Sequence, residues 1–198
     1  MAALTQLQEK VKNKITDKRF RHTLGVRYTA ANIAMRYGAD LIKAQTAALL
    51  HDYAKCLTDK ELLSECRRYG LSISDIERRN PYLLHGKLAA CYGAEEFSIE
   101  DEEILSAVTW HTTGRPGMSL MEKIIFVADY MEPERKMIPG LVRVRSMTYL
   151  DLDETVYLIY ENMLNYLSGN ENGQEKEIDP ISIEAYDYYR KIHDKRKE

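Results

Sequence analysis

The sequence predicts an all-α protein, and three observations carry this prediction. Apolar residues recur at helical spacing along nearly every segment of the chain. A Ser or Thr followed three residues later by Glu marks two helix starts, at Thr58 with Glu61 and at Ser119 with Glu122. No alternating polar and apolar run is long enough to indicate a strand. We therefore expect about eight to ten helices, without an internal repeat.

Short turn signals separate the expected helices. An apolar helical face covers residues 20–35 and stops before the YG dipeptide at 37–38. A second apolar run, which begins at Thr46, ends abruptly in His51-Asp52. Helical spacing returns in 98–111 and in 121–132. The remaining breaks are YG at 69–70, RNP at 79–81, GRPG at 114–117 and IPG at 138–140.

Residues 168–198 differ in character from the rest. Residues 168–179 are polar and rich in Gly, Asn and Glu, so we expect a mobile loop there. Residues 180–198 have helical spacing and several Tyr side chains that need a packing partner. We expect this C-terminal helix to fold back onto a single domain that covers residues 1–198.

Composition points to a soluble cytoplasmic protein. Hydrophobic residues make up 44% of the 198 residues, and the net charge of -3 gives no overall basic field for nucleic acid. A local basic cluster in 12–21 is either a solvated helix face or an attraction for polyphosphate. The three cysteines form no CxxC pair and fit reduced thiols. No apolar run approaches the ~20 residues that span a bilayer, so we expect no membrane partner.

Four histidines lie within or at the ends of apolar helical segments, namely His22, His51, His85 and His111. Taken singly, each is more often a core or capping residue than a ligand, and His193 in the charged tail keeps that interpretation. Two carboxylates accompany them, Asp52 beside His51 and Asp129 inside KIIFVADY. Buried carboxylates are costly unless they are paired or bind metal. One shared metal site explains all six groups together.

The ligand types narrow the choice of metal. Imidazole and carboxylate without thiolate suit iron or manganese, and cobalt or zinc is an alternative. Six ligands are too many for one ion that keeps a position open for water, and they suit two ions about 4 Å apart. Asp52 is the natural bridge between them, because the adjacent His51 holds it beside the first ion.

The order His22, His51-Asp52, Asp129 resembles the H…HD…D signature of the HD-domain metal phosphohydrolase superfamily. His85 and His111 resemble the additional histidines that make some of these sites dinuclear. The chain is also similar to the YqeK family from His22 to Tyr186. The segments that carry this similarity are RHTLGV, ALLHDYAK, LLHG, WHTTGRPGMSLMEKIIFVADYMEPER and PISIEAY.

The resemblance implies an HD-domain helical bundle, a homodimer and symmetrical bis(5′-nucleosyl)-tetraphosphatase activity. Diadenosine tetraphosphate would be cut in the middle to two ADP by a hydroxide held between two metals, with Asp52 as a catalytic group. A nucleoside diphosphate half of the substrate would be held firmly. The alternatives are another HD-type nucleotide phosphohydrolase, either a nucleotidase or a nucleoside triphosphohydrolase, and a non-enzymatic nucleotide-sensing module.

Two residues close to the ligands are expected to contact the substrate. Lys55 follows Asp52 by three residues and can reach the same opening, so we expect a catalytic phosphate contact rather than a surface lysine. Gly25 follows His22 by three residues, and His22 is expected to contact substrate as well as metal. Because Gly is unfavourable inside a helix, Gly25 indicates either close approach of the substrate or a close helix contact.

Further substrate contacts are expected after the last histidine of the cluster. The turn residues TTGRPGMS precede a capped helix, whose exposed N–H groups suit an anion. Thr112 and Arg115 are the candidates there, although a plain connecting loop explains Arg115 equally well. Arg135 and Tyr186 are candidates for the distal phosphate or the base, since an aromatic ring can stack on any base.

Overall fold

Capping side chains begin most of the helices in the computed structural model, which describes residues 2–169 and 176–196. The two predicted capping boxes are present, with Thr58 and Glu61 at one helix start and Ser119 and Glu122 at another. Asp40 caps a third helix by accepting from two backbone N–H groups at 2.7 and 2.9 Å. These local bonds satisfy the donors that a helix leaves unpaired at its first turn.

Eleven α-helices and one short 3-10 helix occur in the described residues, and no strand occurs there, so the predicted all-α class is confirmed. Short helices such as α5 and α9 take the number above the eight to ten expected, because they span too few residues to show a periodic apolar pattern. The helices are α1 (Ala2–Lys14), α2 (Asp17–Tyr37), α3 (Leu41–Leu50), α4 (Asp59–Arg68), α5 (Asp75–Arg79), η1 (Pro81–Leu84), α6 (His85–Phe97), α7 (Glu102–Trp110), α8 (Leu120–Met131), α9 (Leu141–Met147), α10 (Leu152–Leu167) and α11 (Pro180–Lys195).

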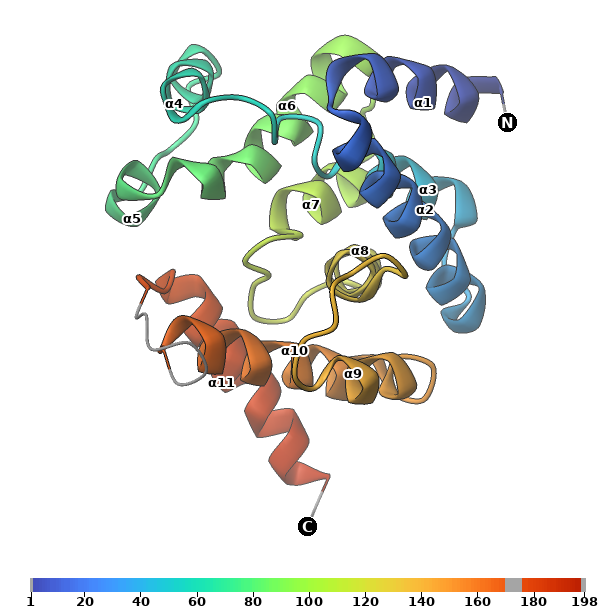
Figure 1. Cartoon of the computed structure of the whole chain (residues 1–198), viewed down its shortest axis with the longest axis vertical. Coiled ribbons are helices and arrows are strands. Elements are labelled where there is room, and N and C mark those ends of the chain that lie inside the picture. Colours follow the sequence, from blue (N-terminus) through green and yellow to red (C-terminus); the bar gives the residue numbers. More distant parts are fainter. Residues whose placement is uncertain (1, 170–175, 197–198) are drawn as a thin grey trace.

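Helix α8 is the centre of the bundle (Figure 1). It packs against α2, α3 and α7 on one side and against α9 and α10 on the other. Most of its residues are buried, and its apolar side chains join both groups of helices. Because α8 touches so many neighbours, a polar side chain on it can face residues from several distant parts of the sequence.

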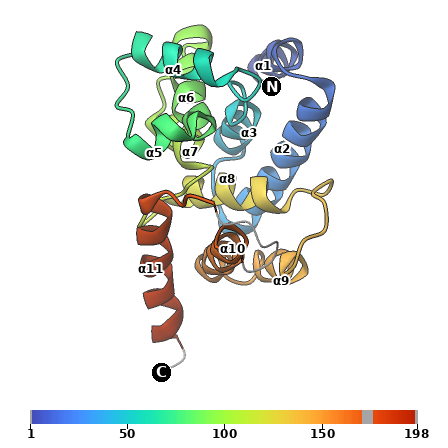
Figure 2. The same ribbon diagram turned by 60° about the vertical axis from the view of Figure 1, so that its left-hand side comes forward.

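The C-terminal helix folds back onto the rest of the protein, as predicted. Helix α11 packs along α10, and Figure 2 shows its C-terminal end pointing away from the other helices. The Tyr189 hydroxyl accepts a hydrogen bond from the Met118 N–H at 3.0 Å, and Tyr157 stacks on Tyr186 with ring centroids 5.8 Å apart. His193 stacks on Tyr157 and contacts Glu154 at 2.6 Å, so it has a structural role here.

The predicted loop over 168–179 lies partly outside the described residues, since 170–175 are not described. The part of it that follows contacts the body of the protein. The Lys176 N–H donates to the Leu167 carbonyl at 2.8 Å, and Glu177 pairs with Arg79 at 2.8 Å. Within the described part of the chain, no helix is long and apolar enough to cross a bilayer.

Candidate metal centre

Five helices bring the six predicted ligands together. Helix α2 supplies one, the end of α3 supplies two, and the start of α6, the end of α7 and the last turns of α8 supply one each. In chain order these are His22, His51, Asp52, His85, His111 and Asp129. Because α2, α3 and α7 pack against α8, and α6 packs against α3 and α7, residues more than one hundred positions apart converge on one cluster.

The His51-Asp52 pair lies where α3 ends. His51 is the last residue to donate a helical bond, to Ala47, and the chain then continues in tight turns. One of these turns is closed by the Lys55 N–H, which donates to the Asp52 carbonyl at 2.9 Å. The turn holds Lys55 beside the Asp52 carboxylate, with Nζ 4.0 Å from Oδ1. The apolar residues that precede His51 pack in the core, whereas the side chains of His51 and Asp52 point toward the other predicted ligands.

The two carboxylate oxygens of Asp52 face different histidines. Oδ2 lies 3.3 Å from His51 Nε2 and 3.6 Å from His22 Nε2. Oδ1 lies 3.2 Å from His85 Nε2 and 3.8 Å from His111 Nε2. Asp52 is 3% exposed, so the protein holds this carboxylate between the two sets of imidazoles.

The cluster therefore has two halves on either side of Asp52. We name the first the Asp129 half, which contains His22, His51 and Asp129; Asp129 Oδ1 lies 3.0 Å from His22 Nε2 and 3.8 Å from His51 Nε2. We name the second the His85 half, which contains His85 and His111, with their Nε2 atoms 3.0 Å apart.

All four imidazoles turn Nε2 toward the centre of the cluster. In three of them Nδ1 lies at hydrogen-bond distance from the backbone carbonyl three residues earlier, and since a carbonyl only accepts, Nδ1 carries the proton. The three bonds are His51 to Ala48 at 2.6 Å, His85 to Tyr82 at 2.5 Å and His111 to Val108 at 2.7 Å. A ring that keeps its proton on Nδ1 binds a metal through Nε2, and any second proton on Nε2 is released when the metal binds.

The charges within the cluster favour ionised carboxylates. Burial opposes ionisation of Asp52, but the charge of His51 and hydrogen bonds from the surrounding imidazoles hold its pKa well below the usual value. Burial likewise opposes ionisation of Asp129, but the hydrogen bond from His22 and the charges of His51 and His111 together outweigh it, so the pKa of Asp129 is also lowered. Ionised carboxylates are the form that binds metal.

Burial keeps the imidazole of His85 neutral near pH 7. Burial lowers the pKa of His85 to about 4, although its hydrogen bond to Asp52 works in the opposite direction. Burial also lowers the pKa of Lys55, against the attraction of Asp52. A neutral His85 is the form that offers a lone pair to a metal.

A cavity of about 320 Å³ opens beside the cluster. Three of the predicted substrate residues line it, namely Lys55, Thr112 and Arg135. The Thr112 hydroxyl lies 3.2 Å from His85 Nε2 and 3.1 Å from His111 Nε2. Lys55 Nζ lies 3.2 Å from His85 Nε2. These residues place one hydroxyl and two cations at the entrance to the cluster.

Two further residues belong to the site and were not named as site residues from the sequence, although Arg19 lies in the basic cluster 12–21 that was one candidate for attracting polyphosphate. Arg19 lines the cavity and pairs with Asp52 Oδ2 at 2.7 Å. It precedes His22 by three residues, so helical spacing could have placed it on the same face. Glu132 accepts from His22 Nδ1 at 3.2 Å and is 3% exposed. Its position in the sequence, three residues after the predicted ligand Asp129, could have indicated that this carboxylate lies near the site.

Four of the predicted substrate residues do not line the described cavity: His22, Gly25, Arg115 and Tyr186. His22 faces the ligands instead, and the space beside Gly25 is filled by Glu132 rather than open to a substrate. The Arg115 guanidinium pairs with Glu122 at 2.9 Å, within the capping box of α8. Tyr186 stacks on Tyr157 of α10.

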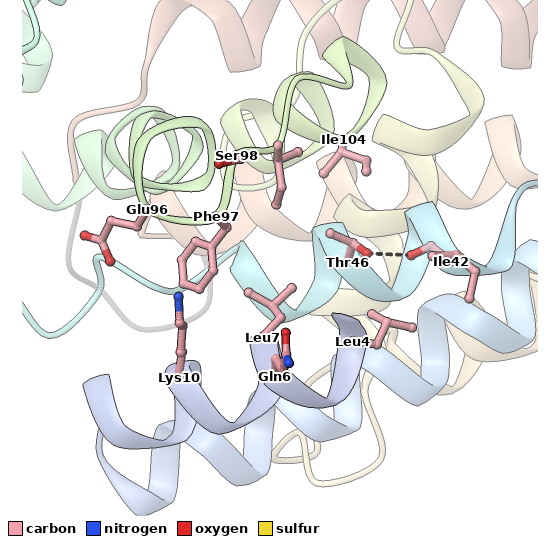
Figure 3. A pocket seen from close by; sticks show the side chains of 11 residues that line it. Leu4, Gln6, Leu7, Lys10, Ile42, Thr46, Glu96, Phe97, Ser98 and Ile104 are labelled. Atoms are coloured by element: carbon pink, nitrogen blue, oxygen red, sulfur yellow. Dashed lines mark hydrogen bonds between the residues drawn. The ribbon is translucent and has the colours of Figure 1, made fainter. Parts of the chain in front are cut away.

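A second and larger groove, of about 520 Å³, lies between α1, α3 and the end of α6. Figure 3 shows its side chains, with Lys10 near Phe97 and Glu96 and with apolar residues such as Leu4 and Ile104 along its length. Its only charged lining residues among those described are Lys10 and Glu96, which is too few for a metal or phosphate site.

The donor set of the cluster fits divalent metal. Four Nε2 atoms and two carboxylates point inward, and atoms of this kind repel one another unless protons or metal cations lie between them. Two overlapping groups meet the distance requirement for a shared ion, His22 with His51 and Asp129, and His51 with Asp52 and His111. The cluster is therefore a site for divalent metal, as predicted.

Comparisons with known proteins agree with this fold and site. Residues 19–134 match the family model of the HD domain, the class of protein that the helical bundle and the His/Asp cluster define. A solved structure from Clostridium acetobutylicum, described as a "predicted HD superfamily hydrolase involved in NAD metabolism", is 34% identical with a TM-score of 0.88. That similarity covers 95% of this chain and 97% of the other.

Comparison with curated relatives shows to which family of HD-domain proteins the chain belongs. A protein of Halalkalibacterium halodurans named "Bis(5'-nucleosyl)-tetraphosphatase, symmetrical" is 46% identical over 79% of this chain and 83% of its own length. A protein of Bacillus subtilis with the same name is 40% identical over the same shares. This chain therefore belongs to the YqeK family of HD-domain hydrolases, and the resemblance predicted from its motifs is confirmed.

Proposed function

We propose that this chain hydrolyses dinucleoside tetraphosphates in the middle, so that diadenosine tetraphosphate and water give two ADP. The relatives named for symmetrical tetraphosphatase activity support this proposal, because they are up to 46% identical over most of both chains. We further propose that the site holds two metal ions and that Asp52 bridges them.

The observation that carries the two-metal proposal is the position of Asp52. Its Oδ2 faces the Asp129 half and its Oδ1 faces the His85 half, at 3.2 to 3.8 Å from the nearest imidazole nitrogens. A carboxylate can bridge two ions when its oxygens point to separate sets of ligands. Imidazole and carboxylate without thiolate support iron first, with manganese, cobalt or zinc as alternatives.

The chain's own residues bind and orient the phosphates. Arg19, Lys55 and Arg135 give the cavity three cations for a strongly anionic tetraphosphate, and Thr112 adds a hydroxyl. One nucleoside diphosphate half is held with its terminal phosphorus toward Asp52. Divalent ions held by the cluster would supply a water of lowered pKa and positive charge beside that phosphorus.

The bond changes then need no side chain to act as an acid. Water oxygen adds to the terminal phosphorus of the held half, the two protons of that water pass to solvent, and the P–O bond to the bridging oxygen breaks. The second ADP leaves with that oxygen as a stable anion. Lys55 and Arg135 stabilise the charge on the phosphate oxygens during this exchange.

The test is product analysis in isotopically labelled water. Metal-stripped protein is reloaded with Fe²⁺ without oxygen, and separately with Mn²⁺ or Co²⁺, and mixed with diadenosine tetraphosphate in H₂¹⁸O. We expect ADP as the only nucleotide product. Each turnover should place one ¹⁸O atom on the terminal phosphate of one of the two ADP molecules. AMP together with ATP would contradict symmetrical cleavage.

The same product analysis, repeated with mononucleotides and nucleoside triphosphates as substrates, separates the alternative functions. A nucleotidase would release nucleoside and phosphate from a mononucleotide, and a triphosphohydrolase would release nucleoside and tripolyphosphate from a nucleoside triphosphate. Binding without turnover would support a nucleotide-sensing module. The homodimer and the cytoplasmic location remain predictions, which light scattering and cell fractionation would test.

A further inference from the structure

The histidines of the cluster differ in what orients them. His51, His85 and His111 each donate Nδ1–H to a carbonyl three residues earlier in the same stretch of chain. His22 lies in the interior of α2, where the helix uses its own carbonyls. Its Nδ1 instead lies 3.2 Å from Oε1 of Glu132, 110 positions further along the chain.

Glu132 is held firmly enough to serve as an orienting group. It follows α8 directly and is 3% exposed. Its second oxygen, Oε2, accepts from the Glu134 N–H at 2.7 Å, and its backbone carbonyl accepts from Arg145 at 2.8 Å. A buried carboxylate fixed at both oxygens leaves His22 little freedom to rotate.

Gly25 makes the room that Glu132 requires. A Cβ atom at position 25 would lie 2.6 Å from Oε2 of Glu132, which is too close for any real contact. The backbone of Gly25 is ordinary helix without a positive φ, so its conformation does not call for glycine. Since Ala is preferred to Gly inside a helix, the carboxylate next to Gly25 is what excludes a side chain there.

We propose that Gly25 and Glu132 form a positioning pair for His22, a step that rests on the proposed metal-dependent function. The Glu132 carboxylate accepts the Nδ1 proton and so fixes the tautomer and the ring direction. The Nε2 lone pair then points toward Asp129 and Asp52. A carboxylate behind a histidine ligand also raises the basicity of that ligand.

A double-mutant cycle tests this pair through metal affinity, measured with Co²⁺ by competition with a chelating dye and without nucleotide. Glu132→Ala should lower the affinity about 10- to 100-fold. Glu132→Gln, which keeps an oxygen that can accept from Nδ1, should lose less. Gly25→Ala should lose affinity by a similar factor to Glu132→Ala, because its Cβ displaces the carboxylate.

The double variant separates this role from packing. When Glu132 is Ala, the nearest remaining Glu132 atom to a Cβ at 25 is its own Cβ, at 3.5 Å, which is an ordinary contact. Gly25→Ala should therefore cause no further loss in the Glu132→Ala background, and it should raise the melting temperature there. Glu134→Ala, at an exposed neighbouring carboxylate, is the matched control and should leave the affinity unchanged.

A second measurement follows the His22 tautomer directly. In the metal-free protein, ¹⁵N shifts should show the His22 proton on Nδ1, and Glu132→Ala should reduce that population. Unchanged affinity and an unchanged tautomer in Glu132→Ala would overturn the proposal, as would losses that add in the double variant. Because these measurements use no nucleotide, they stand or fall separately from the test of the products.

Discussion

The two halves of the metal cluster are held in place by different means. In the His85 half, both histidines bond to carbonyls three residues before them, and their side chains are 0% and 2% exposed. In the Asp129 half, His22 depends on Glu132, and the side chains of His22 and Asp129 are 14% and 25% exposed. The His85 half is thus oriented locally and buried. In the Asp129 half only His51 is oriented locally and buried, whereas His22 depends on a distant contact and lies nearer to solvent.

The difference shows how one metal site can combine a locally fixed, buried set of ligands with a second set that lies closer to solvent. A short-range bond to the backbone forms whenever the turn forms, so the His85 half needs little help from the rest of the fold. The Asp129 half requires α2 and the end of α8 to pack correctly before His22 is oriented. We expect metal affinity at the Asp129 half to be the more sensitive of the two to substitutions far from the cluster.

Substitution of Asp52, which the two halves share, should have the largest effect. Asp52→Ala should remove both ions and abolish turnover while the helices persist, since each half loses a ligand and the bridge. The loss of affinity should exceed the ~100-fold that loss of an orienting partner causes. Metal analysis and circular dichroism check this, with His193→Ala as a control that changes neither. Near-normal activity in Asp52→Ala would refute the bridge.

Removal of a ligand from one half should leave the other half loaded. The parent should hold close to two transition-metal ions per chain, and His85→Ala should hold about one. Asp129→Ala should also hold about one ion, bound at the His85 half. Metal analysis gives the count. A parent with a single ion, unaffected by His85→Ala, would show that the His85 half binds no metal.

Lys55 tests the entrance to the His85 half and should have a smaller effect. Lys55→Ala should keep its metal, because the ammonium is not a ligand. It should lower kcat/KM for diadenosine tetraphosphate roughly ten- to a hundredfold, equivalent to about 1.5 to 3 kcal/mol for a lost charge-assisted contact. Salt should slow the variant less than the parent. Full activity would return Lys55 to a surface role, and changed products would contradict the account of which half is held.

Arg115 should have the smallest effect and should act on stability. Its guanidinium pairs with the buried Glu122 in the capping box of α8 rather than with the cavity. Because the pair is partly solvent-exposed, Arg115→Ala should lower the free energy of unfolding by about 1 kcal/mol and leave KM unchanged. Thermal denaturation and steady-state kinetics measure both. A raised KM would support the anion contact expected from the sequence.

Sequence alone was enough for the class of fold and for the ligand types. Helical spacing and the two capping boxes predicted an all-α protein, because caps and periodicity are local properties. The candidate ligands were identified because histidines and carboxylates stand out in apolar segments. The short helices α5 and α9 were missed, since five and seven residues are too few for a periodic pattern.

The tertiary structure decided which polar residues meet. Gly25 and Glu132 lie far apart in sequence, and neither one alone indicates that a carboxylate fills the space above the glycine. Arg115 and Arg135 both follow the last histidine of the cluster, yet only Arg135 lines the cavity, because the α8 capping box binds the other. Such choices depend on how helices pack around α8, and packing brings together groups whose spacing in the sequence carries no periodic signal.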